Sequence, residues 1–433
     1  PRVYVSYCVP LHKTTLKRPM CVIMGNESCD LDSAVCSLSL AIYYQQFPPT
    51  TITDKKHFLP VFNIPRHDFP LKTEVVYFMQ QHQITADLLT FRDELQQDPV
   101  KACDFILVDH HVSPFAKQCV EVYDHRPFDA SSGLPERCKL TLELVGSCAT
   151  LIAETILKGS NVAEFADVLK MLHAAIVMDT VNFSLEAARA TAKDNHIAEE
   201  IEKVLRIDDF VAKRLEIFRE LCTAREDVSA LSAHQLLYKD MKLLANKQAT
   251  LKVALPGYPI RVQDFLLRQN AADAVKEFAR QENCGVVLLI GMKVEQDGSV
   301  KRDIGLVNIS NDKLFDKILN KLLFTKDPDL HLQEIRNCGF LNGKFFDQKN
   351  VKATRNITTI NRYLRCIPID IHLFSVIWIL LQIFQELVII MLTTLIGGLR
   401  SQVSQFPDAL TRAHLSICVA FANQHYVGYF LRQ

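Results

Sequence analysis

The chain has no excess of charge of either sign. Its 433 residues contain 49 Lys plus Arg and 49 Asp plus Glu. No dense stripe of basic residues with interleaved aromatic residues is present, so we expect no nucleic-acid partner. A composition with 48% hydrophobic and 23% charged residues is typical of a folded soluble protein, and the length allows two or three domains.

Paired cysteines are also missing. The sequence has 13 cysteines, an odd number, without a CxxC pair or a regular spacing. This pattern favours reduced, mostly buried thiols, and we expect a cytoplasmic location. The stretch before Gly25 contains Lys13, Lys17 and Arg18 and no long apolar core, so no signal peptide is predicted. Since the chain starts at Pro1 and not at a methionine, we expect the natural N-terminus upstream.

Short apolar runs alternate with helical patterns in the first part of the chain. We predict strands at 20–25, 58–62, 105–108 and 120–123, and helices at 32–44, 71–81, 146–157 and 164–178. This alternation indicates a mostly parallel sheet that is covered on both faces. The functional side chains of such sheets lie at the carboxyl ends of the strands.

A second α/β unit follows a charged helical stretch. We predict its strands at 251–255, 285–290 and 304–308, and its helices at 262–280 and 311–323. The fold class is therefore α/β with two domains. We expect a parallel-sheet domain over 1–187, a helical linker over 188–224 and a smaller α/β domain over 225–366.

Four polar motifs follow elements of the first unit. They are GNESCDLDS at 25–33, VDHH at 108–111, YDHRP at 123–127 and VMDT at 177–180. Two carboxylates at i and i+2 on a turn, such as Asp30 and Asp32, can bind a hard divalent cation, but they can also cap a helix. Three of the motifs lie at strand ends, where a cluster of polar residues needs partners.

Taken in this order, the motifs resemble the DHH phosphoesterase superfamily. The prune/exopolyphosphatase branch, which is related to the manganese-dependent family II pyrophosphatases, is the most similar. The segments FNIPR at 62–66 and ELVGSCAT at 143–150 are similar to blocks of that branch, and the match covers about residues 20–365. The resemblance implies a two-domain DHH fold with a C-terminal DHH-associated domain that binds substrate.

The resemblance also implies a site for two metal ions, either Mn²⁺ or Mg²⁺. Oxygen-rich sites with one histidine suit these ions better than zinc or copper. The implied ligands are Asn26 and Asp30 for one ion, Asp32 and His125 for the other, and Asp109 and Asp179 for both.

Further roles follow from the same resemblance. Asp109, His110 and Arg126 would take part in catalysis, with Arg126 as a phosphate-facing cation where many relatives have a second histidine. His110 and His111 would lie behind the ligands or face the substrate; the alternative is that they are structural histidines held by hydrogen bonds. Asn26 stands where pyrophosphatases have a histidine, which favours the prune-like branch.

The second domain is expected to supply cations to the substrate. Lys242 resembles a family lysine that reaches the phosphates, although Lys239 and Lys242 would also fit a solvated helix face. Arg355 is retained from a family block that ends Ser-Arg-Lys. Thr354 and Asn356 replace its serine and lysine, and losing a cation next to a polyanion weakens binding.

The last part of the chain, 367–433, has a different character. An apolar run at 373–399 is long enough to span a bilayer and is interrupted by Gln382, Gln385 and Glu386. Its hydrophobic residues outweigh the one acid, so insertion is physically allowed. A variant or wrongly assigned terminus, a partner-binding helix and a membrane anchor all stay open, and we do not place the protein at the membrane on this segment.

The leading hypothesis is a metal-dependent exopolyphosphatase that cleaves phosphoanhydrides of short inorganic polyphosphates or similar small molecules. One alternative is a phosphodiesterase acting on cyclic nucleotides. The other is a weakly active interaction protein whose partners bind the C-terminal region. The glycine-rich GGGH block of oligonucleotide-cleaving relatives is absent from the sequence, which argues against a nuclease.

Overall fold

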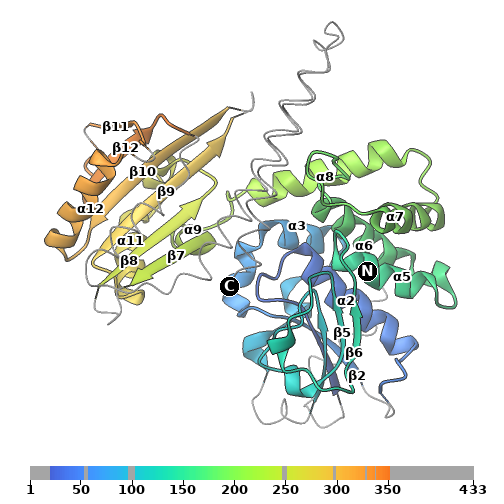
Figure 1. Cartoon of the computed structure of the whole chain (residues 1–433). Coiled ribbons are helices and arrows are strands. Elements are labelled where there is room, and N and C mark those ends of the chain that lie inside the picture. The colour runs from blue at the N-terminus through green and yellow to red at the C-terminus, as the bar shows by residue number, and fades with distance from the viewer. Residues whose placement is uncertain are drawn as a thin grey trace, which may run out of the picture. The chain divides into compact units, whose positions relative to one another are not determined.

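The computed structural model describes residues 20–52, 57–95, 103–245, 251–295, 299–326, 329–336 and 338–351. Within these ranges the strands form two six-stranded sheets (Figure 1). Arg355, Asn356 and the apolar segment 373–399 lie outside the described residues. None of the helices in the described ranges combines the length and apolar character needed to cross a membrane.

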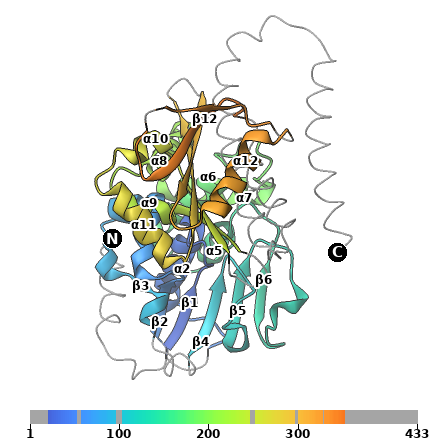
Figure 2. The same cartoon turned by 90° about the vertical axis from the view of Figure 1, so that its left-hand side faces the viewer.

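The first sheet is parallel throughout, with strand order β3-β2-β1-β4-β5-β6. Its strands are β1 (Met20–Met24), β2 (His57–Phe62), β3 (Thr90–Phe91), β4 (Asp104–Val108), β5 (Cys119–Asp124) and β6 (Lys139–Leu142). Figure 2 shows β2, β1, β4, β5 and β6 side by side. The predicted parallel sheet is thereby confirmed, and the four predicted strands are its four central strands.

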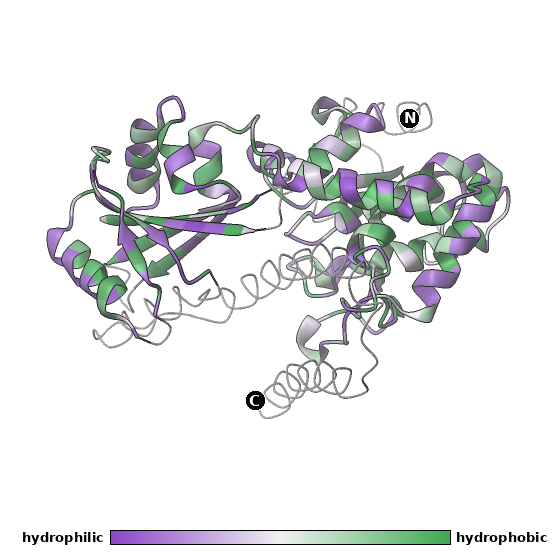
Figure 3. Ribbon diagram, turned by 90° about the horizontal axis from the view of Figure 1, so that it is seen from above, coloured by the Kyte–Doolittle hydropathy of each residue, from purple (hydrophilic) through white to green (hydrophobic). Residues whose placement is uncertain are grey.

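Helices of the first unit pack against one another and against this sheet. They are α2 (Leu31–Gln46), α3 (Thr73–Gln81), α5 (Cys148–Leu157), α6 (Ala166–Asp179), α7 (Ala192–Leu205) and α8 (Phe210–Glu226). A continuous core joins one sheet face, including Ile23 and Ile106, to α2, α5 and α6. A smaller cluster on the other face contains Val22 and Phe105, with Phe115 packed against it. Figure 3 shows hydrophobic and hydrophilic residues alternating along these helices, as expected of amphipathic helices.

The turn between β1 and α2 depends on close approach of the backbone at Gly25. A Cβ atom at this position would lie 2.8 Å from Cβ and 2.9 Å from the carbonyl oxygen of Ser33. The side chain of Asp30 then caps α2 by accepting a hydrogen bond from the amide of Ser33. Glycine at position 25 therefore lets the loop fold back onto the first turn of the helix.

Gly25→Ala is expected to lower the free energy of unfolding by about 1–3 kcal/mol, because the methyl group overlaps the backbone of α2. Urea denaturation measures the change. Gly339→Ala is the matched control, since a Cβ there meets nothing within 4 Å. It should change stability by less than about 0.5 kcal/mol. Equal unfolding midpoints for the two variants would contradict the close packing.

The second sheet has the order β11-β12-β10-β9-β8-β7, and only its β8–β9 pair is parallel. Its strands are β7 (Asp240–Ala245), β8 (Lys252–Tyr258), β9 (Val286–Val294), β10 (Val300–Asn308), β11 (Leu332–Glu334) and β12 (Asn342–Gln348). Its helices are α9 (Ala233–Lys239), α10 (Val262–Leu266), α11 (Ala271–Gln281) and α12 (Asp312–Phe324). A second core cluster includes Leu237, Phe265, Phe278 and Leu289. The three predicted strands are all present.

Candidate metal centre

Three neighbouring strands of the first sheet deliver the polar motifs to one edge. β1, β4 and β5 are adjacent in the sheet. The loop before α2 follows β1, Asp109 follows β4, and His125 follows β5. The Nδ2 atom of Asn26 donates to Oδ2 of Asp109 over 2.7 Å, and Nε2 of His125 lies 3.1 Å from Oδ1 of Asp109. Segments that are about a hundred residues apart in sequence therefore meet at the strand ends.

Asp109 is the centre of this cluster and is only 1% exposed. Besides Asn26 and His125, it accepts a hydrogen bond from Oγ of Ser33 over 2.6 Å, and an Arg126 nitrogen lies 2.8 Å from Oδ1. Burial alone would raise the pKa of Asp109, but the hydrogen bond from His125 and the charge of Arg126 lower it to about 2. Asp109 is therefore ionised at neutral pH.

The backbone of Asp109 is in the left-handed region, with φ at 59°. Aspartate and asparagine tolerate this conformation better than most residues, but it still carries strain. The main-chain amide of Asp109 donates to the carbonyl of Tyr123 over 2.8 Å, and its carbonyl accepts from Arg126. These contacts fix the direction of the Asp109 carboxylate.

Asp32 lies beside Asp109, on the first turn of α2. Its two carboxylate oxygens accept hydrogen bonds from the amides of Cys148 and Ala149, over 2.7 and 2.8 Å. Both amides belong to the N-terminus of α5. Ligand atoms of Asp32, Asp109 and His125 all lie within 4.8 Å of one another. Asp32 therefore does cap a helix, as the alternative to metal binding predicted. The helix that it caps is α5 and not α2, on which Asp32 lies.

Two further carboxylates belong to the same electrostatic cluster. Burial, followed by the charges of Asp109 and Asp32, raises the pKa of Asp30 to about 7. Burial, followed by Asp32 and Asp30, raises the pKa of Asp179 at the end of α6 well above its usual range. The pKa of Asp32 is raised in the same way, by burial and by Asp109. The negative charge of this cluster is not balanced by its own side chains, and divalent cations would balance it.

The donor set fits hard divalent ions. The cluster offers carboxylate oxygens and one imidazole at His125, which suits Mn²⁺ or Mg²⁺. Asn26, a predicted ligand, turns Nδ2 toward Asp109, while its Oδ1 accepts from the amides of Ser28 and Cys29. Nδ1 of His125 lies 3.1 Å from the carbonyl of Val145, a contact that directs the other ring nitrogen toward Asp109. Burial opposes the charge on His125, but Asp109 and Asp32 raise its pKa to about 10. A metal ion at Nε2 would therefore displace a proton.

The side chain of Arg126 is held by two aspartates, whereas the resemblance implied a cation that faces the phosphate. Its side chain is 40% exposed, and one terminal nitrogen contacts the carbonyl and carboxylate of Asp109 and, at 3.0 Å, Oδ1 of Asp124. The charges of these acids raise its pKa. Arg126 thus joins the ends of β4 and β5, and part of its guanidinium group remains accessible.

The two adjacent histidines differ in their contacts. His111 uses both ring nitrogens: Nδ1 lies 2.5 Å from Oδ2 of Asp124, and Nε2 accepts from the amide of Asp129 over 2.8 Å. These bonds favour the structural alternative for His111. His110 bonds only the carbonyl of Val108, at 3.0 Å through Nδ1, and its buried Nε2 has no hydrogen-bond partner among the described residues. Burial lowers the pKa of His110.

Comparison with known proteins adds an independent line of evidence. Residues 219–358 match the family described as the DHHA2 domain. The chain is 38% identical over 271 residues to the protein named exopolyphosphatase PRUNE1 of Bos taurus, covering 61% of this chain and 57% of that protein. The human protein of the same name is 35% identical over 279 residues, covering 63% and 59%. Over these regions the chain is similar to prune-like proteins of the DHH phosphoesterase superfamily.

The chain spans less than two thirds of the length of these two relatives. A protein named putative exopolyphosphatase of Schizosaccharomyces pombe is 25% identical over 358 residues, covering 77% of this chain and 87% of that protein. A solved structure of a putative family II inorganic pyrophosphatase of Methanococcus jannaschii covers 80% of this chain, with 16% identity and a TM-score of 0.42. A likeness at that level carries no argument about the site.

The site also uses residues for which the sequence analysis predicted no role. Ser33 donates to Asp109, Asn63 donates to the carbonyl of Gly25 over 2.9 Å, and the first amides of α5 hold Asp32. Ser33, Asn63 and Cys148 all belong to blocks quoted from the sequence. Their position in these blocks was the only indication that the sequence offered. Their hydrogen-bonding roles depend on which atoms the fold brings together.

The lysines of the second unit are not on a solvated helix face. Lys242 lies in β7, is 7% exposed and contacts Oδ2 of Asp240 at 3.3 Å. Lys239 ends α9, and its amino group donates to the carbonyl of Leu71 and to Oγ1 of Thr73. Burial lowers the pKa of Lys239 to about 8.

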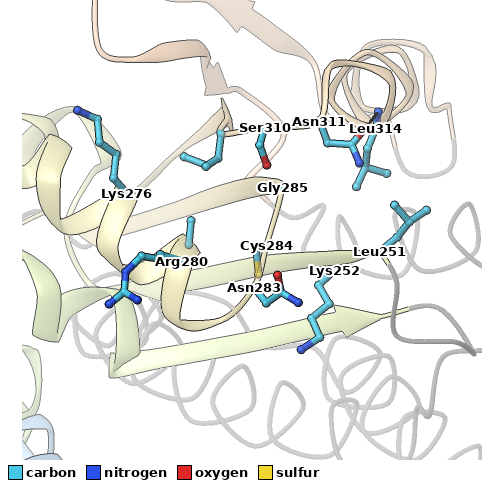
Figure 4. A pocket seen from close by; sticks show the side chains of 12 residues that line it. Leu251, Lys252, Lys276, Arg280, Asn283, Cys284, Gly285, Ser310, Asn311 and Leu314 are labelled. Carbon is cyan, nitrogen blue, oxygen red and sulfur yellow. Dashed lines mark hydrogen bonds between the residues drawn. The ribbon is translucent and has the colours of Figure 1, made fainter.

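A pocket of about 400 Å³ lies elsewhere in the second unit, at the ends of β8, β9 and β10 where Figure 4 shows Lys252, Lys276 and Arg280. None of the predicted site residues lines it. Lys276 and Arg280 are exposed and form ion pairs within α11, with Asp273 and Glu277. The pocket is therefore separate from the candidate metal centre.

Proposed function

We propose that this chain is an exopolyphosphatase that hydrolyses the terminal phosphoanhydride bond of short inorganic polyphosphates with the help of two Mn²⁺ or Mg²⁺ ions. The observation that carries the proposal is the group of Asp32, Asp109 and His125, whose ligand atoms lie within 4.8 Å of one another. Asp30 and Asp179 interact electrostatically with these aspartates, and bound cations would relieve the repulsion among the carboxylates. The similarity to proteins named exopolyphosphatase PRUNE1 supports the choice of polyphosphate as the substrate.

The proposed ligands are those that the resemblance implies. Asn26 and Asp30 would hold one ion, Asp32 and His125 the other, and Asp109 and Asp179 both. When bound, such ions would activate a water for attack and would neutralise charge on the phosphoryl oxygens.

The surrounding residues would orient this set. Ser33, His125 and Arg126 hold Asp109 in one direction through the contacts described above. His110 has a free Nε2 in a buried setting and would contact a phosphoryl oxygen or a water. Arg126 would keep its contact with Asp109, and the accessible part of its guanidinium group would contact the substrate.

Substrate binding would use cations of the second domain. Lys242 and Arg355 are the proposed phosphate-binding residues. His111 is proposed to act on substrate binding indirectly, by holding Asp124 at the end of β5. We also propose a reducing, cytoplasmic location, since the ten cysteines of the described ranges are all free thiols.

A phosphate-release panel tests the proposal. Purified protein is assayed with pyrophosphate, tripolyphosphate, tetrapolyphosphate, long-chain polyphosphate and cyclic AMP, each with Mg²⁺ and with Mn²⁺. We expect the highest kcat/KM for the short linear polyphosphates. Cleavage of cyclic AMP alone would replace the proposal with a phosphodiesterase, and no turnover of any compound would favour an interaction protein.

A further inference from the structure

Arg92, directly after β3, is a cation at the same sheet edge as the candidate metal centre. The strands of the first sheet are all parallel, so their carboxyl ends lie along one edge (Figure 2). Along this edge Asn63 follows β2, the loop with Asn26 and Asp30 follows β1, and Asp109 follows β4. In the sheet order β3 lies two strands from β1, about 9–10 Å at the usual strand spacing.

The Arg92 side chain turns from the end of β3 toward the loop between β1 and α2. Its Nη1 donates to Oε1 of Glu27 over 2.9 Å and to Oδ1 of Asn63 over 3.4 Å. Glu27 is the neighbour of Asn26 in this loop. Asn63 in turn donates to the carbonyl of Gly25 over 2.9 Å. The guanidinium group therefore lies against the loop that carries two of the proposed metal ligands.

Most of the Arg92 guanidinium is available for an anion. Both side-chain contacts of Arg92 within the described ranges use Nη1, so Nε and Nη2 have no partner there, and the side chain is 37% exposed. Arg66, whose side chain is 36% exposed, differs in this respect. Its Nε, Nη1 and Nη2 donate to Glu94, to the carbonyl of Ala86 and to the carbonyl of Leu89. Of these two arginines, Arg92 is therefore the one with donors to spare.

The ion pair between Arg92 and Glu27 is one that an anionic substrate can replace. The Glu27 side chain is 74% exposed, and ion pairs this accessible contribute little to stability. A polyphosphate carries more negative charge than one carboxylate, and its phosphoryl oxygens match the planar fork of donors in a guanidinium. Glu27 would turn into solvent, and a phosphoryl group would take its place on Arg92.

Two arginines flank the acidic cluster along the sheet edge. Arg126 follows β5 and contacts Asp109, the proposed shared ligand, whereas Arg92 follows β3 on the other side of β1. An anion held at the metal ions reaches Arg92 only if it continues for several phosphoryl groups. We propose that Arg92 binds a phosphoryl group distal to the cleaved bond and thereby favours tetrapolyphosphate over pyrophosphate. This inference rests on the proposed function.

Steady-state kinetics with anions of different chain length and Mn²⁺ test the inference. Arg92→Gln is expected to raise KM for tetrapolyphosphate about tenfold, because charge-assisted hydrogen bonds to the distal group are lost. For pyrophosphate, KM (or Ki, if it is not hydrolysed) should change less than about twofold, as should kcat for tetrapolyphosphate. Arg280→Gln is the matched control: it removes an exposed arginine from an ion pair with Glu277 on α11 and should leave these constants unchanged.

Glu27→Gln separates substrate binding from positioning of the loop. If Arg92 binds substrate, removing the competing carboxylate should lower KM for tetrapolyphosphate by about two- to fivefold. If the ion pair only positions the loop, Arg92→Gln and Glu27→Gln should both raise this KM and both weaken Mn²⁺ binding, which calorimetry measures. We expect the Mn²⁺ affinity of both variants to stay within about twofold of wild type. A parallel loss in the two variants would overturn the inference.

Direct binding distinguishes failure of this inference from failure of the proposed function. If wild type hydrolyses none of the anions, the proposed function fails, and calorimetry of the Mn²⁺-loaded protein with tetrapolyphosphate then tests Arg92 alone. An affinity about tenfold weaker in Arg92→Gln would keep Arg92 as an anion-binding residue, and equal affinities would overturn the inference. If wild type hydrolyses tetrapolyphosphate and Arg92→Gln has the wild-type KM at each chain length, only the inference on Arg92 fails.

Discussion

Asp109→Asn is expected to release phosphate from tripolyphosphate at least about a thousandfold more slowly than wild type when Mn²⁺ is saturating. Asp109 is the proposed ligand shared by both ions, and it is the residue that Ser33, His125 and Arg126 hold in place. Losing a bridging carboxylate weakens both the activation of the water and the neutralisation of phosphoryl charge, each of which contributes several kcal/mol to the rate. Phosphate release at saturating substrate measures the loss in kcat.

Asparagine is the right substitution because it isolates the charge. It has nearly the same shape as aspartate and tolerates the left-handed backbone at position 109, where alanine would add strain. Circular dichroism should therefore show an intact fold. Asp129→Asn, at an exposed turn, is the matched control and should keep wild-type activity. Equal activity of Asp109→Asn and wild type would exclude the proposed role.

Metal binding is expected to stabilise the fold, most strongly near neutral pH. The folded-state pKa of Asp30 is raised to about 7 from an ordinary value of 3.8. Its contribution to stability is therefore complete below about pH 4 and is lost as the pH rises through 7. The Tm of metal-free protein should fall across this range, and the pKa of Asp179 is raised in the same direction.

Mn²⁺ should reverse that loss. At a free concentration of about 100 times Kd, a bound ion adds about 2.7 kcal/mol, which corresponds to a rise in Tm of about 5–10 °C at pH 7.5. Scanning calorimetry with EDTA and with Mn²⁺ measures the difference. Asp30→Asn should raise the Tm of the metal-free protein and reduce the response to Mn²⁺. A response to Mn²⁺ that is identical in Asp30→Asn and wild type would contradict the assignment.

The sequence predicted the first sheet well because its central strands are mostly buried and mostly apolar. β1 is buried along its whole length, and β5 likewise. β3 was missed because it has two residues, and β6 because its first two side chains are exposed. No strand was predicted at β7, and a solvated helix face was left open for Lys242; the pairing with β8 decides the structure of this segment.

The candidate site was predicted to the level of residues but not of contacts. Strand-end positions predicted that Asp30, Asp109 and Asp124 lie at one edge of the sheet, whereas the role of His125 came from the resemblance. The roles of Ser33 and of the first amides of α5 depend on the tertiary approach of helices, which no local pattern encodes.

The central claim is metal-dependent hydrolysis of a phosphoanhydride. Its most direct test is the release of orthophosphate from tripolyphosphate by one preparation of the purified chain, first treated with EDTA and then given Mn²⁺ in increasing amounts. We predict that the treated protein is inactive and that activity returns as two ions bind per chain. Turnover that persists in EDTA, or that fails to appear with either Mn²⁺ or Mg²⁺, would contradict the claim.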